Sequence, residues 1–105
     1  LDRRSQGLLS FERRNIMNKT LAFIGLDDVD FVISCWNKKI HDKGYIEVDA
    51  LEGLFFMELP FDHSMAWTNT LNMDDFERDP QGRNYYYLTL REPTNNKLTI
   101  PKMNH

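Results

Sequence analysis

Residues 26–44 read LDDVDFVISCWNKKIHDKG and contain the clearest structural signal in the chain. Apolar residues recur there at helical spacing, at i, i+3, i+4, i+7 and i+11: Val29, Val32, Ile33, Trp36 and Ile40. Aspartates are grouped at the beginning of the stretch, lysines lie toward its end, and a glycine follows, which is the arrangement that the helix dipole and a helix terminus favour. The pattern predicts a helix over residues 27–43 with one buried face.

Two further helices are expected, one on either side of the first. Before it, apolar residues at spacings near multiples of 3.6 are interleaved with arginines and are followed by Gly25, which predicts a helix over residues 8–24. After it, an Asp-x-x-Glu capping pattern precedes an apolar run that ends before Pro60, which predicts a helix over residues 50–58. Residues 53–59 are also compatible with a buried strand, because they contain a glycine that weakens a helix.

The second half of the chain has a different pattern. Helical periodicity fades over residues 60–84, where DPQG at 79–82 is a turn signal, so we expect an irregular connection with a short strand around residues 66–71. Residues 84–91 are rich in Tyr, Thr and Leu and predict a strand, and residues 97–100 are expected to pair back on it as a β-hairpin. The predicted fold class is therefore α+β, with N-terminal helices, an irregular segment and a C-terminal hairpin.

Length and composition indicate one globular domain. The chain has 105 residues, of which 41% are hydrophobic and 28% charged, and two separate cores would each be close to the lower size limit for stable folding. Because the chain begins at Leu1, we expect an excised domain of a longer protein or a processed subunit. The longest apolar run, residues 54–57, is far shorter than the roughly 18 residues that a membrane span requires. A single cysteine, Cys35, excludes an internal disulfide and favours an intracellular location.

The net charge of −3 conceals an uneven distribution along the chain. Residues 1–25 carry +3, residues 26–44 carry −1, residues 45–79 carry −8 and residues 80–105 carry +3. Phosphate backbones are bound by concentrated lysine and arginine, so a nucleic-acid surface would require the two basic ends to meet in space. A solvated surface of mixed charge is the more usual explanation of such a pattern.

Residues 27–58 resemble the EF-hand family in pattern. A helix from Asp27, a loop glycine at Gly44, Ile46 two residues later and an exiting helix follow the spacing of the family. The positions that the resemblance assigns to calcium ligands do not carry carboxylates; they are Lys39, His41, Lys43 and Ala50. Ammonium and methyl groups cannot replace carboxylates around calcium, so the resemblance implies a degenerate hand that binds no calcium and serves helix packing or partner binding.

Residues 82–89, GRNYYYLT, resemble the wing strand of winged-helix proteins, which implies a small nucleic-acid-binding domain as the alternative function. The acidic helix predicted over residues 50–58 would repel a phosphate backbone if it were used as a recognition helix. Aromatic side chains in the strand could instead stack on unpaired bases beside arginines. The residues that could act in this way are Tyr85, Tyr87, Arg83 and Arg91.

No sequence motif of an enzyme, a metal site or a dinucleotide site occurs in the chain. The tripeptide Asp62-His63-Ser64 combines an acid, a base and a hydroxyl, but a catalytic triad is defined by its spatial geometry, so we expect a hydrogen-bonded turn there. Aromatic side chains make up 12% of the chain and are common anchors of protein interfaces. We therefore expect a non-catalytic protein-interaction module or an accessory subunit of a larger assembly, with no cofactor. The candidate partner-binding residues are Tyr85, Tyr87, Arg83, Arg91 and Trp67.

Overall fold

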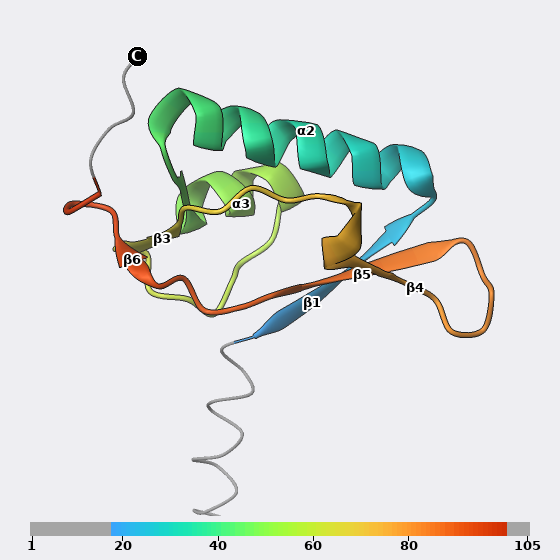
Figure 1. The fold of residues 1–105 in the computed structure, drawn as a ribbon. Helices are drawn as coiled ribbons and strands as arrows, with labels where there is room; N and C mark the ends of the chain where they lie inside the picture. The colour runs from blue at the N-terminus through green and yellow to red at the C-terminus, as the bar shows by residue number, and fades with distance from the viewer. Residues whose placement is uncertain (1–17, 101–105) are drawn as a thin grey trace, which may run out of the picture.

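The computed structural model describes residues 18–100 (Figure 1). Its elements in chain order are β1 (Lys19–Ile24), α2 (Leu26–Lys43), β2 (Ile46–Glu47), α3 (Val48–Phe55), β3 (Met65–Trp67), the 3-10 helix η1 (Met73–Asp75), β4 (Phe76–Arg78), β5 (Tyr85–Leu90) and β6 (Asn95–Asn96). The strands form two antiparallel three-stranded sheets, ordered β1-β5-β4 and β2-β3-β6. The predicted α+β class is confirmed.

The helix predicted over residues 27–43 is confirmed as α2. It begins one residue earlier than predicted, at Leu26, and its buried residues belong to the predicted apolar face: Val29, Val32, Trp36 and Ile40. The helix ends at Gly44, which has φ of 90° and donates its N–H to the carbonyl of Ile40 at 2.7 Å. Glycine adopts this left-handed conformation without a Cβ clash, so the predicted terminator has the expected physical role.

The helix predicted over residues 8–24 is wrong in its described part. Residues 8–17 lie outside the described residues, and Lys19–Ile24 is strand β1. Leu21 and Phe23 are buried while the residues between and beside them are exposed, which is the two-residue period of a strand. Pairing of all six residues with β5 satisfies this alternation, and that long-range pairing overrides the helical spacing of the apolar residues.

The helix predicted over residues 50–58 is confirmed as α3, but it begins two residues earlier and ends three residues earlier than predicted. Residues 53–55 are helical, so the alternative strand over 53–59 is not formed. The chain leaves the helix at Phe56, which has φ of 55° and donates its N–H to the carbonyl of Glu52 at 2.7 Å. Phe56 is the one non-glycine residue with positive φ within residues 18–100.

Phe56 provides a test of backbone strain. Its side chain is 92% exposed, so little buried surface is lost on truncation, whereas its left-handed backbone favours glycine. We expect Phe56→Gly to raise the free energy of unfolding by about 1 kcal/mol in urea denaturation. Phe56→Ala is the matched control, because it removes the same ring but keeps the Cβ. Equal effects of the two variants would show that the backbone of Phe56 is not strained.

The predicted hairpin is only half correct. The strand predicted over residues 84–91 is confirmed as β5, but its partners are β1 and β4, and residues 97–100 do not pair with it. Leu88 lies opposite Leu21 on one side and opposite Phe76 on the other, so this register buries three apolar side chains together. Residues 97–100 form a turn instead, in which the N–H of Thr99 donates to the carbonyl of Asn96 at 2.9 Å. The strand expected around residues 66–71 is shorter, Met65–Trp67, and pairs with β2 and β6.

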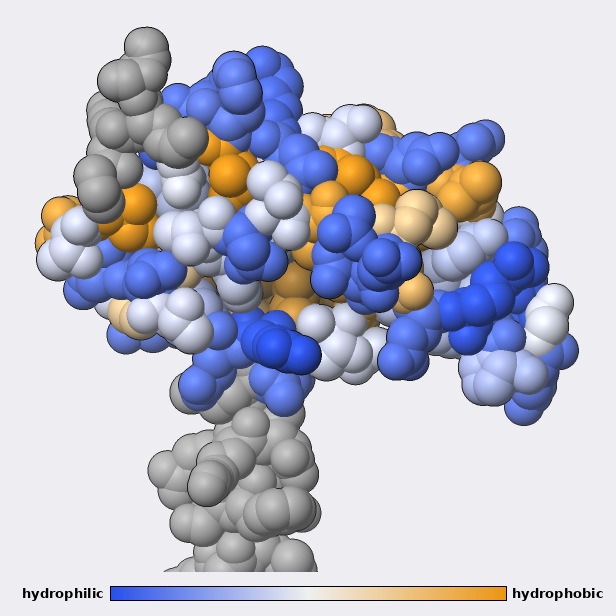
Figure 2. Space-filling model, viewed as in Figure 1, coloured by the Kyte–Doolittle hydropathy of each residue, from blue (hydrophilic) through white to orange (hydrophobic). Residues whose placement is uncertain are grey.

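Both helices lie on the same side of the β1-β5-β4 sheet, and no other element of residues 18–100 covers its opposite side (Figure 1). Aromatic rings fill the core under the helices: Phe23 and Phe76 have centroids 5.6 Å apart, and Trp36 and Trp67 have centroids 5.7 Å apart. Hydrophilic side chains cover most of the surface seen in Figure 2, with apolar side chains visible along the lower edge of α2. Neither described helix has the length and apolarity to cross a membrane.

Candidate functional site

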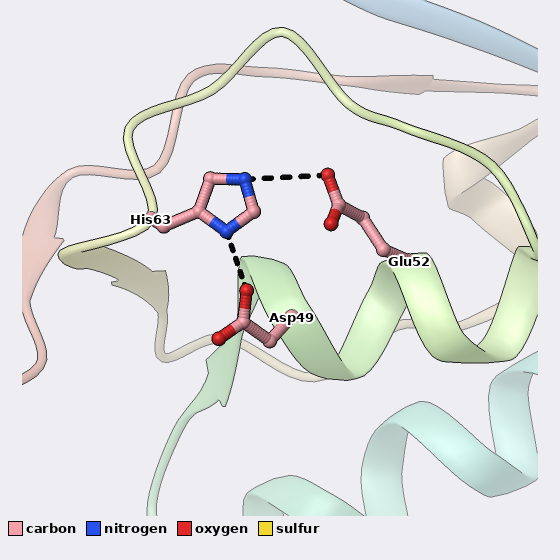
Figure 3. Close-up of side chains that lie close together, drawn as sticks. All are labelled: Asp49, Glu52 and His63. Atoms are coloured by element: carbon pink, nitrogen blue, oxygen red, sulfur yellow. Dashed lines mark hydrogen bonds and ion pairs between the residues drawn. The ribbon is translucent and has the colours of Figure 1, made fainter.

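Three ionisable side chains meet beside α3 (Figure 3). Asp49 and Glu52 are three residues apart on α3 and therefore project from the same face of the helix. His63 comes from the segment between α3 and β3. Its Nδ1 is hydrogen-bonded to Oδ1 of Asp49, and its Nε2 lies 3.4 Å from Oε2 of Glu52. The imidazole ring is thus held between two carboxylates.

The segment that carries His63 is fixed by its own hydrogen bonds. The N–H and the hydroxyl of Ser64 both donate to Oδ1 of Asp62, at 2.9 and 2.8 Å. The N–H of Leu59 donates to Oε2 of Glu52 at 2.8 Å, which ties the segment to α3 at a second point. The tripeptide Asp62-His63-Ser64 therefore forms the hydrogen-bonded turn that was expected, and its histidine faces α3, where its partners are the two carboxylates.

The charges around His63 favour its protonated form. Chiefly the hydrogen bond to Asp49, and then the negative charge of Glu52, raise the pKa of His63 above its ordinary value. Lys97 acts in the opposite direction and has its Nζ 3.9 Å from Oδ2 of Asp49. A protonated imidazole carries an N–H on both nitrogens, so it can donate to Asp49 through Nδ1 while Nε2 forms an ion pair with Glu52. The three residues form a proton-dependent clamp, here called the His63 clamp, between α3 and the segment that follows it.

The His63 clamp also contains the donor types of a metal site. Within residues 18–100 it is the one group of three His, Cys, Asp or Glu residues whose ligand atoms lie within 4.8 Å of one another. A metal ion would be bound by a single ring nitrogen, whereas the two carboxylates face different nitrogens of the ring. The side chains of His63 and Asp49 are 51% and 57% exposed, so the cluster is not enclosed in a cleft. The positions of the two carboxylates therefore fit a doubly protonated imidazole ring better than a metal ion bound by the three residues.

The His63 clamp predicts a specific pH dependence of stability. Because the pKa of His63 is higher in the folded chain, the clamp contributes full stability below the unfolded value of about 6.5 and loses it as pH rises through the folded value. We expect His63→Gln to lower the melting temperature at pH 5.5 and to have little effect at pH 9. In NMR titration, Asp49→Asn should shift the pKa of His63 downward. An equal loss of stability in His63→Gln at both pH values would contradict the clamp.

The residues that the EF-hand resemblance assigns to ligand positions lie on the two helices. Lys39, His41 and Lys43 belong to the last turns of α2, and Ala50 belongs to the first turn of α3. The helices are joined by residues 44–47, which include the short strand β2. Nζ of Lys43 lies 3.4 Å from a carboxylate oxygen of Glu47. That the chain binds no calcium stays a prediction.

The five residues predicted to bind a partner lie in different environments. Tyr85 and Tyr87 are half-buried on the side of β5 that faces away from the helices. The guanidinium of Arg83 lies over the ring of Tyr85, 5.4 Å from its centroid. Arg91 is exposed, but Trp67 is only 6% exposed and donates its indole N–H to the carbonyl of Arg91 at 2.9 Å. The structure therefore brings Arg83, Tyr85 and Tyr87 together on a surface and places Trp67 in the core.

A buried carboxylate that sequence analysis missed organises this surface. The side chain of Asp79 is 2% exposed; its Oδ2 accepts from Nε of Arg83 at 2.9 Å, and its Oδ1 accepts from the hydroxyl of Tyr87 at 3.0 Å. The N–H groups of Gln81 and Arg83 also donate to Oδ2. The Arg83 side chain is the largest cause of a pKa of Asp79 well below its usual range. The signal that could have revealed it is an aspartate at the first position of a turn.

Comparisons with protein-family models, with curated proteins and with solved structures find no match to this chain. The function proposed below is therefore supported by the arrangement of residues 18–100 alone.

Proposed function

We propose that the domain is a non-catalytic protein-interaction module or an accessory subunit of a larger assembly, and that its partner docks on the face of the β1-β5-β4 sheet that no element of residues 18–100 covers. This open face is formed by alternate residues of the three strands: Thr20, Ala22, Ile24, Tyr85, Tyr87, Thr89 and, on the edge strand β4, Glu77. The observation that supports the proposal is the kind of residue found at the centre of this open face. Ile24, which is 65% exposed, lies opposite Tyr85, and Ala22 lies opposite Tyr87. The solvated face of an antiparallel sheet is usually polar, whereas this one has apolar and aromatic residues where β1 meets β5 and a carboxylate, Glu77, on the β4 side.

The open face is rigid in the way that a binding surface requires. The hydroxyl of Tyr87 is held by Asp79, and the ring of Tyr85 is covered by the Arg83 guanidinium, so both rings are oriented before any partner arrives. Oriented aromatic side chains lose little conformational entropy on binding. At the other end of the face, the hydroxyls of Thr20 and Thr89 lie 3.0 Å apart and form a polar margin. An apolar centre with a polar margin is typical of protein interfaces.

The charge of the described residues favours a protein partner over a nucleic acid. Residues 18–100 contain fourteen acidic and eight basic side chains, which gives a charge of −6. Phosphate binding requires unpaired cations, and Arg83 is already paired with Asp79. A partially basic protein partner with an apolar centre complements the apolar residues of the open face and the negative charge of the described residues as a whole.

The proposal is tested by a matched pair of variants. We expect Tyr85→Ala to weaken partner binding by about 30-fold, the loss typical of an interface anchor, because it removes an oriented ring from the open face. Phe31→Ala is the control, since it removes an aromatic side chain that is 60% exposed on α2, away from the open face. Proteins captured from the source cells are compared by quantitative mass spectrometry, after circular dichroism has shown that both variants are folded.

Two results would contradict the proposal. One is a set of captured proteins that Tyr85→Ala and Phe31→Ala retain equally. The other is tight binding of single-stranded or duplex oligonucleotides whose affinity falls by orders of magnitude with salt, because counterion release is the signature of phosphate recognition. Reversing the charges of Arg83 and Arg91 would then abolish that binding and would support the nucleic-acid alternative.

A further inference from the structure

Strand β1 is an edge strand whose outer side has no partner within residues 18–100. It stands first in the order β1-β5-β4, and β5 is the one described strand that pairs with it. No backbone hydrogen bond joins its outer side to another described segment. The free N–H and C=O groups of an edge strand are a template on which a further strand can add.

The two edges of this sheet differ in how they resist such addition. The opposite edge, β4, has three residues, two of which are the exposed charged residues Glu77 and Arg78, and it runs directly into the turn that Asp79 holds. Short length and charge are the usual means by which natural sheets prevent edge pairing. Strand β1 has six residues, KTLAFI, with one charge, at Lys19, and neither proline nor glycine. Only β1 therefore offers a long and unprotected edge.

We propose that the edge of β1 pairs with the same edge of a second copy of this chain, antiparallel about a two-fold axis, so that two β1-β5-β4 sheets become one six-stranded sheet. The charges at the two ends of β1 favour antiparallel over parallel pairing. Lys19 begins β1, and Asp27 and Asp28 follow its other end in the first turn of α2. None of the three takes part in an ion pair within residues 18–100. Antiparallel pairing brings the basic end of each copy to the acidic end of the other, whereas parallel pairing would bring like charges together.

The alternation of side chains fixes the register. Residues directly opposite in an antiparallel pair project on the same face, so a residue on the helix side must oppose another residue on the helix side. Two central registers satisfy this rule. One places Ala22 opposite itself and Leu21 opposite Phe23, and the other places Leu21 opposite itself and Lys19 opposite Phe23. The second register would pack an ammonium group against an apolar ring on the buried side, so Ala22 lies on the two-fold axis.

A groove beside the beginning of β1 fits this arrangement. It is lined by Asn18, Lys19, Glu58, Leu59 and Pro60. In the register with Ala22 on the axis, the beginning of β1 lies beside the end of β1 of the second copy, where α2 of that copy begins. Leu26, the first residue of α2, is 47% exposed near this end. Pairing could therefore cover apolar surface there in addition to the backbone groups of the edge.

Cysteine cross-linking tests the register directly. In a Cys35→Ser background, Ala22→Cys places two thiols across the axis, at a Cα separation of about 5 Å that a disulfide can span. Thr20→Cys is the matched control: it lies on the same exposed face, but its counterpart is offset by four residues, or about 13 Å. We expect a covalent dimer on non-reducing gels for Ala22→Cys and monomer for Thr20→Cys. Equal cross-linking of the two variants, or none in Ala22→Cys, would overturn the proposal.

Sedimentation of the full chain provides the second measurement. The wild type is expected at twice its mass of 12.5 kDa, and Ala22→Glu at 12.5 kDa, because two carboxylates would then face each other on the axis. Thr89→Glu, on β5 and the same open face, should stay dimeric. Lys19→Glu should weaken the dimer, and Lys19→Glu combined with Asp27→Lys should restore it. A wild-type chain that is monomeric at all concentrations overturns the inference. The proposed function is tested separately, by Tyr85→Ala on β5, which leaves the edge of β1 unchanged.

Discussion

Replacing Trp36 by alanine is expected to lower the free energy of unfolding by about 3–5 kcal/mol. Trp36 is 1% exposed at the centre of the buried face of α2, and its ring packs on that of Trp67 with centroids 5.7 Å apart. Its indole N–H donates to the carbonyl of Asn69 at 2.7 Å, so truncation leaves both a cavity and an unpaired carbonyl. Domains of this size are stable by only about 5–15 kcal/mol, so the variant should be close to unfolding.

The measurement is urea denaturation followed by circular dichroism, with two comparisons. Trp36→Phe keeps an aromatic ring in the core but loses the hydrogen bond to Asn69, so it should cost less than Trp36→Ala, by about 2 kcal/mol. Phe31→Ala, on the outer side of the same helix, should change stability by no more than about 0.5 kcal/mol. A loss below about 1 kcal/mol in Trp36→Ala would mean that Trp36 is exposed in solution and would recast it as an interface anchor.

Helix α2 could be predicted because its signals are local and agree with one another. The apolar spacing, the acidic first turn and Gly44 all lie within one stretch of chain, and each favours the same structure. Helix α3 is predictable for the same reason, but the sequence pattern predicts its end three residues too late. The chain leaves the helix at Phe56, and a left-handed phenylalanine carries none of the usual sequence signals for a helix terminus.

The sheet could not be predicted from local pattern because its pairings are remote in sequence. In β1, Leu21 and Ile24 have helical spacing, and only the pairing with residues 85–90 reveals that Leu21 and Phe23 form the buried face. For the same reason, the local pattern predicts that residues 97–100 pair with the neighbouring residues 84–91, whereas β5 pairs with the more distant β1.

The residues of the His63 clamp were partly visible in the sequence. The sequence places His63 between Asp62 and Ser64, but its partners are on α3, and no sequence pattern indicates that the segment after α3 folds back on the helix. For Asp79, the sequence indicates only a place in the turn at residues 79–82. Its burial depends on Arg83 and Tyr87, which the turn places within reach of its two oxygens.

Trp67 is expected to behave as a core residue, in contrast to the partner-binding role that its sequence suggested. Its ring packs between those of Trp36 and Phe61, with centroids 5.7 and 5.5 Å away, and its indole N–H donates to the carbonyl of Arg91. We therefore expect Trp67→Ala to lower the free energy of unfolding by about 3–5 kcal/mol, measured by urea denaturation. A partner-binding residue on the surface would instead leave stability almost unchanged and reduce partner affinity.

A double-mutant cycle separates the packing of the two tryptophans from their individual burial. Because the rings of Trp36 and Trp67 are in contact, the effects of Trp36→Phe and Trp67→Phe should not add, and the interaction energy should be about 0.5–1.5 kcal/mol. The matched cycle pairs Trp67→Phe with Phe56→Ala, whose ring is 92% exposed, and should show additive effects within about 0.5 kcal/mol. Additivity in both cycles would mean that the two indoles do not pack on each other. The contact of α2 with this part of the chain would then have to be held by the hydrogen bonds of Trp36 to Asn69 and of Asn37 to Leu71, which join α2 to the segment that follows β3.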